Sequence, residues 1–129
     1  MAEGLMGLRI YQLAEALADE VWQEVITWKP FPRDTVGRQL VEAADSIGGN
    51  IAEGYGRYYF KENRQFQLYA RGSLHETRHW LRRARVRKLM TDVRCKELTA
   101  KVEELAPQLN AYIKTLERRS RERKPKEQQ

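Results

Sequence analysis

Cysteine and histidine are scarce in this chain of 129 residues, which has one cysteine and two histidines. A single cysteine, Cys95, cannot form an internal disulfide, so nothing indicates an oxidising compartment. No apolar run approaches the roughly 18 residues of a membrane span. Met1 to Gly7 lack the basic and apolar regions of a secretory signal. We therefore expect a cytoplasmic protein with no membrane segment.

The usual signatures of catalysis are also missing. The glycines from Gly48 to Gly56 lack the lysine and hydroxyl pair of a phosphate-binding loop. Ser46, Asn50 and Glu53 share a helical face, but no histidine stands near them in sequence to act as a base. We expect them to form hydrogen bonds with neighbouring helices instead. The sequence thus predicts a protein that is not an enzyme, with no catalytic residue, bound metal or cofactor.

One short motif points to different chemistry. His75, Glu76 and His79 form the H-E-x-x-H pattern, in which two imidazoles hold zinc and the glutamate activates water. The chain has no third histidine, so Glu97 or Glu103 would have to complete the site. Arginines on the same helical sector would repel a dication. A zinc hydrolase is therefore an alternative that the neighbouring charges disfavour.

The net charge of +6 conceals a division along the chain. Residues 1–56 carry 4 Lys and Arg against 9 Asp and Glu, a net charge of −5, and residues 57–129 carry 20 against 9, a net charge of +11. Such a division suits binding of a polyanion. It equally suits docking of the acidic face of one subunit on the basic face of the next.

Apolar spacing at steps of three and four predicts four helices, at about residues 8–27, 34–55, 61–89 and 92–118. Pro30 and Pro32 lack a donor N–H and separate the first two helices, and Asp34 is expected to cap the second. Gly54 and Gly56 are expected to supply the turn after it. Residues 1–118 then fold as one all-α, antiparallel up-and-down four-helix bundle, with residues 119–129 as a charged flexible tail.

Each helix has a face that we expect to be buried. In the second helix this face holds Leu40, Ala44, Ile47 and Ile51. In the third it holds Phe66, Tyr69, Ser73, Thr77, Trp80 and Ala84, extended by Ala70, Leu74 and Leu81. In the fourth it holds Leu98, Val102, Leu105, Leu109, Tyr112 and Leu116. Gly48 and Gly49 cost the second helix roughly 2 kcal/mol relative to alanines. We therefore expect a neighbouring backbone beside them, with Gly72 and Ser73 opposite.

The third predicted helix also carries a continuous basic face. Its arginines lie within one helical sector, and further cations widen the face near the helix end. The predicted nucleic-acid contacts are Arg64, Arg71, Arg78, Arg82, Arg83, Arg85, Arg87 and Lys88. Guanidinium groups suit phosphate oxygens, so RNA or DNA would be bound through the backbone without sequence preference. Alternatively, carboxylates of other helices or subunits neutralise these arginines.

The second predicted helix contains a motif that resembles the protein family encoded within intervening sequences of 23S ribosomal RNA genes. The matching residues are Ser46, Asn50, Ile51, Ala52, Glu53, Gly54, Gly56 and Arg57. The resemblance implies a four-helix bundle that assembles into a homopentameric ring. Relatives include the accessory proteins of diversity-generating retroelements, which bind nucleic acid and a reverse transcriptase.

Together these features predict a non-enzymatic, ring-forming accessory protein that binds nucleic acid and partners a reverse transcriptase. The alternative is a self-assembling scaffold for an unknown protein partner. Trp28, Phe31, Tyr58 and Tyr59 stand near predicted turns, where they suit either subunit contacts or the ends of the bundle core.

Overall fold

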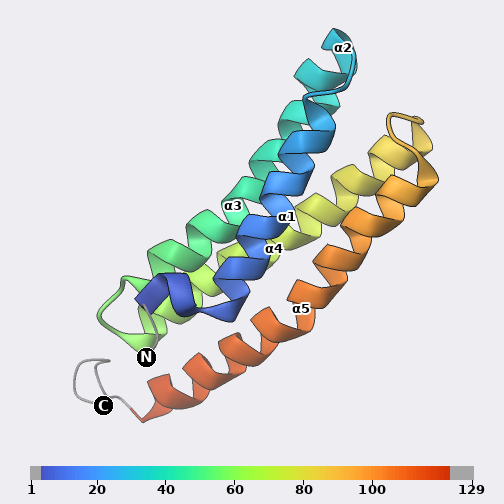
Figure 1. The fold of residues 1–129 in the computed structure, drawn as a ribbon. Coiled ribbons are helices and arrows are strands. Elements are labelled where there is room, and N and C mark those ends of the chain that lie inside the picture. The colour runs from blue at the N-terminus through green and yellow to red at the C-terminus, as the bar shows by residue number, and fades with distance from the viewer. Residues whose placement is uncertain (1–3, 123–129) are drawn as a thin grey trace.

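The computed structural model describes residues 4–122 and consists of helices joined by short turns (Figure 1). Its elements are η1 (Gly4–Gly7), α1 (Arg9–Val25), α2 (Pro30–Pro32), η2 (Arg33–Gly37), α3 (Arg38–Tyr55), α4 (Phe60–Val86) and α5 (Asp92–Arg121). Helices α1, α3, α4 and α5 are long, and α2 with η2 forms the lead-in to α3. None of the described helices is both long and apolar enough to cross a membrane.

The four long helices pack side by side as an antiparallel bundle, which confirms the fold predicted from the apolar spacing (Figure 1). Contacts join α1 with α3, α3 with α4, α4 with α5 and α5 with α1, so each helix has two neighbours. The core contains the predicted faces of α3 and α5 except for Tyr112, which is half-buried while its neighbour Ile113 is buried. Fully buried members of these faces are Leu40, Ile47, Ile51, Leu98 and Leu105. Burial of these stripes is the main stabilising term for such a bundle.

The second long helix begins differently from the prediction. Lys29 is extended, and helical geometry starts at Pro30 and continues through a π-helical turn into α3. Asp34 therefore does not cap a helix. A proline fits the first turn of a helix because its missing N–H has no helical acceptor there. Gly37 is required by packing, since a Cβ at this position would lie 2.6 Å from Val25 Cγ1.

Gly54 has a role that its sequence position did not reveal. It lies inside α3 rather than in a turn, and Gly56 ends that helix with an ordinary φ of −78°. A Cβ at Gly54 would lie 2.6 Å from Asn63 Oδ1 and 2.7 Å from Gln67 Nε2. The absence of a side chain thus lets α4 approach α3 closely. Gln67 Nε2 then donates to the carbonyl oxygen of Ile51 at 3.2 Å and to Asn63 Oδ1 at 2.8 Å.

The other glycine predictions were wrong. A Cβ at Gly48 would make only ordinary contacts, at 3.8 Å from Ala14 and Tyr11, and one at Gly49 or Gly72 would meet nothing within 4 Å. No described backbone therefore requires these three glycines, and Gly72 does not face Gly48 and Gly49.

The buried face of α4 is also rotated from the predicted one. Tyr69, which we expected in the core, is 52% exposed, and Phe66, Ser73 and Trp80 are only half-buried. Five residues of the predicted face are buried, and they are joined by three that were not predicted: Thr77, Ala84, Ala70, Leu74 and Leu81, with Phe60, Asn63 and Gln67. The aromatic residues of this helix were predicted to be buried because of their size, whereas the polar Asn63 and Gln67 take buried positions that the sequence pattern did not indicate.

Helix α5 extends beyond its predicted end. Thr91 caps it by accepting a hydrogen bond from Arg94 N at 3.1 Å, and the helix runs through Pro107 to Arg121. Arg119 and Arg121 are thus helical rather than part of the predicted tail. The rest of that tail, residues 123–129, lies outside the described residues.

Candidate nucleic-acid interface

The predicted arginine face of α4 divides into two parts with different surroundings. In the part nearer the helix start, the arginines lie against α5. Arg64 Nε is 3.4 Å from Glu117 Oε2, and Arg71 Nη1 donates to Asn110 Oδ1 at 3.3 Å. Arg78 makes a two-pronged pair with Glu103, with both N–O distances at 2.7 Å. This part therefore bridges α4 and α5.

The Arg78–Glu103 pair shifts the pKa of both partners. The hydrogen bonds from Arg78 lower the pKa of Glu103, and the same bonds raise the pKa of Arg78. Two parallel N–H to oxygen bonds hold the charges in a fixed geometry. The charge of Arg78 is thus largely neutralised before any external phosphate arrives.

The part near the end of α4 is free of such pairing. We call this part the cationic end of α4, and it consists of Arg82, Arg83, Arg85, Arg87 and Lys88. Within residues 4–122, none of these five side chains forms an ion pair, and all except the half-buried Arg83 are exposed. Cations are stabilised at the C-terminus of a helix, where the free backbone carbonyls carry partial negative charge. Five cations within seven residues nevertheless leave a strong positive field.

The backbone at the cationic end of α4 is unusual. Lys88 has a φ of 60°, in the left-handed region that glycine commonly occupies after a helix. Leu89 N donates to the carbonyl oxygen of Ala84 at 2.9 Å, and Lys88 N donates to that of Arg85 at 3.0 Å. A non-glycine residue in this conformation costs about 1–2 kcal/mol. Lys88 therefore adopts a backbone conformation that glycine would adopt with less strain.

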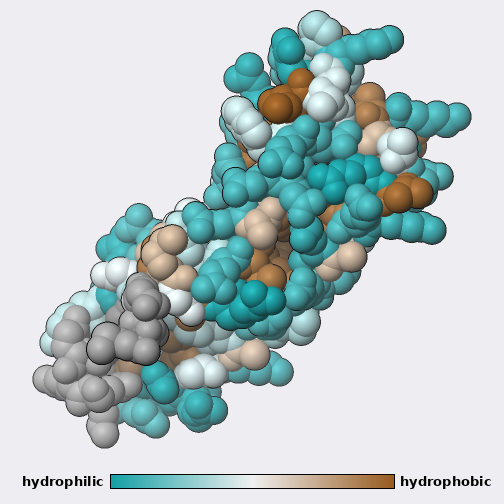
Figure 2. All heavy atoms as spheres, in the orientation of Figure 1, coloured by the Kyte–Doolittle hydropathy of each residue, from teal (hydrophilic) through white to brown (hydrophobic). Residues whose placement is uncertain are grey.

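Three carboxylates of α1 and α5 pair with cations of α5. Arg94 contacts Glu20 at 3.0 Å, Glu97 at 2.9 Å and Glu24 at 3.5 Å, and Lys101 contacts Glu20 at 2.8 Å. The hydrogen bond from Lys101, aided by Arg94, lowers the pKa of Glu20. The seam between α1 and α5 is therefore held by ion pairs. Figure 2 shows a mostly hydrophilic surface there, with apolar side chains visible within the seam.

The residues of the predicted motif are chiefly structural. Asn50 Nδ2 donates to the carbonyl oxygen of Ser46 at 2.9 Å within α3. Arg57 pairs with Glu53 at 2.9 Å and lies over the ring of Phe66 at 4.6 Å. The first two contacts stay within α3 and its end, so the predicted hydrogen bonds of Asn50 and Glu53 to neighbouring helices are not found among the described residues. The Arg57–Phe66 contact and the close approach at Gly54 join the end of α3 to α4.

The H-E-x-x-H motif lies on α4 beside these pairs. His75 Nδ1 is 3.0 Å from Nη1 of Arg78, whose Nε and Nη2 donate to Glu103. The positive guanidinium thus occupies the position next to the imidazole. Across residues 4–122, no three His, Cys, Asp or Glu side chains gather as a metal site requires. The zinc-hydrolase alternative gains no support from this arrangement.

The four aromatic residues that were predicted near turns differ in their exposure. Trp28 is 7% exposed and donates from Nε1 to Glu24 Oε2 at 2.8 Å, so it closes an end of the core. Phe31 is 78% exposed, and Tyr58 and Tyr59 are exposed where α3 turns into α4. The last three remain available for contact with another molecule.

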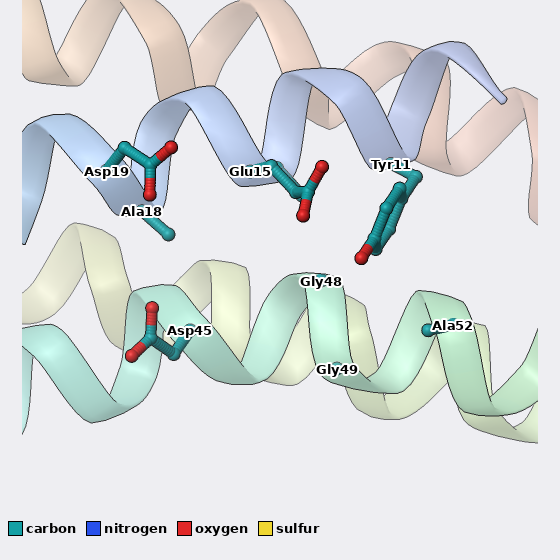
Figure 3. Close-up of a pocket in the computed structure, with 9 residues that line it drawn as sticks. Tyr11, Glu15, Ala18, Asp19, Asp45, Gly48, Gly49 and Ala52 are labelled. Carbon is teal, nitrogen blue, oxygen red and sulfur yellow. The ribbon is translucent and has the colours of Figure 1, made fainter. Parts of the chain in front are cut away.

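A hollow between α1 and α3 was not predicted from the sequence. It has a volume of about 230 Å³ and a floor of small residues, including Gly48, Gly49 and Ala52. Asp19 on α1 lies opposite Asp45 on α3 across it, and Glu15 on α1 lies opposite Gly48 (Figure 3). Partial desolvation by its neighbours, and secondarily the charge of Asp19, raises the pKa of Asp45, although this residue remains partly exposed. The signal for this site lay in the −5 charge of residues 1–56, which no interhelical ion pair across the described α1–α3 seam neutralises.

An all-α antiparallel four-helix bundle with a cationic helix end is the class that fold and surface define. Residues 6–111 match the family described as 23S rRNA-intervening sequence protein. The chain therefore belongs to that family, as its motif predicted.

A solved structure from Bacteroides thetaiotaomicron, described as a protein with unknown function from the S23 ribosomal protein family, is similar in fold. Its TM-score is 0.74 at 17% sequence identity, and the match covers 81% of this chain and 98% of that chain. At this identity the likeness concerns the fold alone. No curated protein matches the chain.

Proposed function

We propose that the protein binds the backbone of RNA or DNA through the cationic end of α4 and catalyses no reaction. The observation that carries this proposal is the contrast along one helix. Arg64, Arg71 and Arg78 contact groups on α5, whereas the five cations that follow have no ion-pair partner within residues 4–122. Unpaired guanidinium and ammonium groups release counterions from a phosphate backbone, which favours binding without sequence preference.

Two triple variants test this proposal. One changes the exposed Arg82, Arg85 and Arg87 to alanine, and the matched control changes Arg64, Arg71 and Arg78 to alanine. Both remove three positive charges from α4. Fluorescence anisotropy with a duplex DNA and a structured RNA should show about tenfold or greater weakening for the first variant and much less for the control.

Equal weakening by the two variants would mean that only net charge matters and would overturn the assigned surface. Failure of the wild-type chain to bind either nucleic acid at low salt would overturn the function itself. Circular dichroism of both variants checks that the bundle remains folded.

A second candidate function is self-assembly into a ring, which the hollow between α1 and α3 favours. Its carboxylates complement the cationic end of α4, and the two surfaces lie on different elements of the bundle. Such a head-to-tail contact closes into a ring when the rotation between subunits permits it. The pentamer implied by the family would be one such ring.

Light scattering tests this assembly. Changing Asp19 and Asp45 to asparagine should lower the molecular mass of the wild-type oligomer, and raised salt should act in the same direction. A mass that is unchanged by both treatments would exclude this contact. A reverse transcriptase as partner rests on the family resemblance, and co-purification of the two chains would test it.

A further inference from the structure

A second site lies at the opposite end of the bundle from the cationic end of α4. It is a hollow of about 660 Å³, where the start of α1, the end of α3, the start of α4 and the end of α5 meet. Its volume falls within the range of small-molecule sites, roughly 300–1,000 Å³. The hollow is lined by Leu8, Tyr55, Phe60, Asn63, Tyr112, Thr115, Leu116 and Arg119.

The wall of this hollow combines apolar side chains with the hydroxyl group of Tyr112. Asn63 is 1% exposed, and its Nδ2 donates to the hydroxyl oxygen of Tyr112 at 3.0 Å. The Tyr112 hydroxyl therefore serves as an acceptor, and its own proton is not donated to any acceptor among residues 4–122. Burial raises the pKa of Tyr112, so this hydroxyl keeps its proton at neutral pH. A ligand with an acceptor atom would satisfy it.

A cation stands at the edge of the same hollow. The guanidinium of Arg119 lies 5.5 Å from the centroid of the Phe60 ring and forms no ion pair within residues 4–122. Stacking on the ring holds the guanidinium in place while its N–H donors stay accessible. Arg118 and Lys114 are exposed on the same part of α5.

Two exposed aromatic rings directly precede Phe60 in the chain. Tyr58 and Tyr59 are exposed at the turn between α3 and α4, and their rings stand edge to face with centroids 4.6 Å apart. Aromatic faces interleaved with cations are the combination that holds single-stranded nucleic acid, because every base can stack and every phosphate is negative. A duplex, whose bases are already stacked, cannot use such rings.

We propose that this hollow takes an unpaired nucleobase of single-stranded RNA or DNA, with the adjacent phosphate on Arg119. The base enters the hollow among its apolar lining and accepts a hydrogen bond from the Tyr112 hydroxyl. This inference rests on the proposed nucleic-acid function and assigns its single-stranded ligand to a site separate from the cationic end of α4. The protein thereby gains a preference for strands with unpaired bases.

The test uses a short adenine-rich single strand that carries 2-aminopurine, whose fluorescence changes when the base leaves its stacked neighbours in the strand and enters the hollow. Thr115→Trp fills the hollow without altering charge, and Arg119→Ala removes the phosphate contact. Each change should weaken single-strand binding about tenfold. Thr115→Trp should also abolish the fluorescence change, while binding of the matching duplex stays at the wild-type value.

The control is the variant with Arg82, Arg85 and Arg87 changed to alanine, which should lose duplex binding and keep the fluorescence change of the single strand. Wild-type single-strand affinity in both Thr115→Trp and Arg119→Ala would overturn the hollow as a base site and leave the proposed function standing. Equal loss of single-strand and duplex binding in Thr115→Trp would also overturn it. A wild-type chain that binds neither strand nor duplex would overturn both proposals.

Discussion

Single glycines in α3 have opposite roles although they stand close together in sequence. Gly54 allows Asn63 and Gln67 to pack directly on the α3 backbone, whereas Gly49 has open space where a side chain would project. The sequence indicated that glycines matter in this segment, because they cost helix stability. It did not indicate which one is needed, since that depends on the distance between α3 and α4.

Gly54→Ala is expected to destabilise the bundle by about 1–3 kcal/mol, because the new methyl group would overlap Asn63 and Gln67. Gly49→Ala is the matched control. It should stabilise the bundle by about 1 kcal/mol, since alanine favours a helix and meets nothing at this position. Urea unfolding followed by circular dichroism measures both effects. A shift of the same sign in the two variants would contradict the assigned contact.

Asp45 provides a pH-dependent prediction. Its pKa is raised above the usual 3.8 by partial desolvation and by Asp19, so the charged form is less stable in the folded chain than in the unfolded chain. The charged Asp45 carboxylate therefore destabilises the folded chain at neutral pH. This destabilisation vanishes as the pH falls below 3.8, where Asp45 is protonated in both the folded and the unfolded chain.

Asp45→Asn should therefore raise the melting temperature at neutral pH, and the difference from wild type should shrink as the solution is acidified. Thermal unfolding of both proteins across this range measures the effect. A constant difference at all pH values would indicate that the charge of Asp45 is not responsible.

At the scale of the element, α4 shows what sequence periodicity can and cannot predict. The helix, its length and its basic sector follow from spacing along one chain. The pairing of Arg78 with Glu103 depends on how α4 and α5 slide against each other, which no single helix encodes. The buried Asn63 and Gln67 were missed for a related reason, because their partners Tyr112 and the Ile51 carbonyl come from other helices.

The turn after α4 gives a test at this scale. Lys88→Gly should stabilise the bundle relative to Lys88→Ala by about 1 kcal/mol, because glycine adopts a positive φ without the steric clash of a Cβ. Both variants lose the same charge, so both should bind duplex DNA equally and more weakly than wild type. Chemical unfolding and fluorescence anisotropy separate the two effects. Full wild-type affinity in both variants would remove Lys88 from the proposed surface.

At the scale of the whole molecule, charge is sorted by element. Ion pairs neutralise the α1–α5 seam and the middle of α4, and they leave carboxylates in the α1–α3 hollow and cations at the end of α4. The net charges of −5 and +11 in the two parts of the sequence foreshadowed this separation. These net charges did not show where the unpaired cations lie, because composition does not distinguish a paired arginine from an unpaired one.

The salt dependence of duplex DNA binding tests this separation most directly. Each phosphate contact contributes about 0.9 to the slope of log affinity against log salt concentration. Changing Arg82, Arg85 and Arg87 to alanine should reduce the wild-type slope by about two to three units, whereas changing Arg64, Arg71 and Arg78 should leave it nearly unchanged. An unchanged slope in the first variant, or an equal reduction in the second, would contradict the assignment of the phosphate contacts to the cationic end of α4.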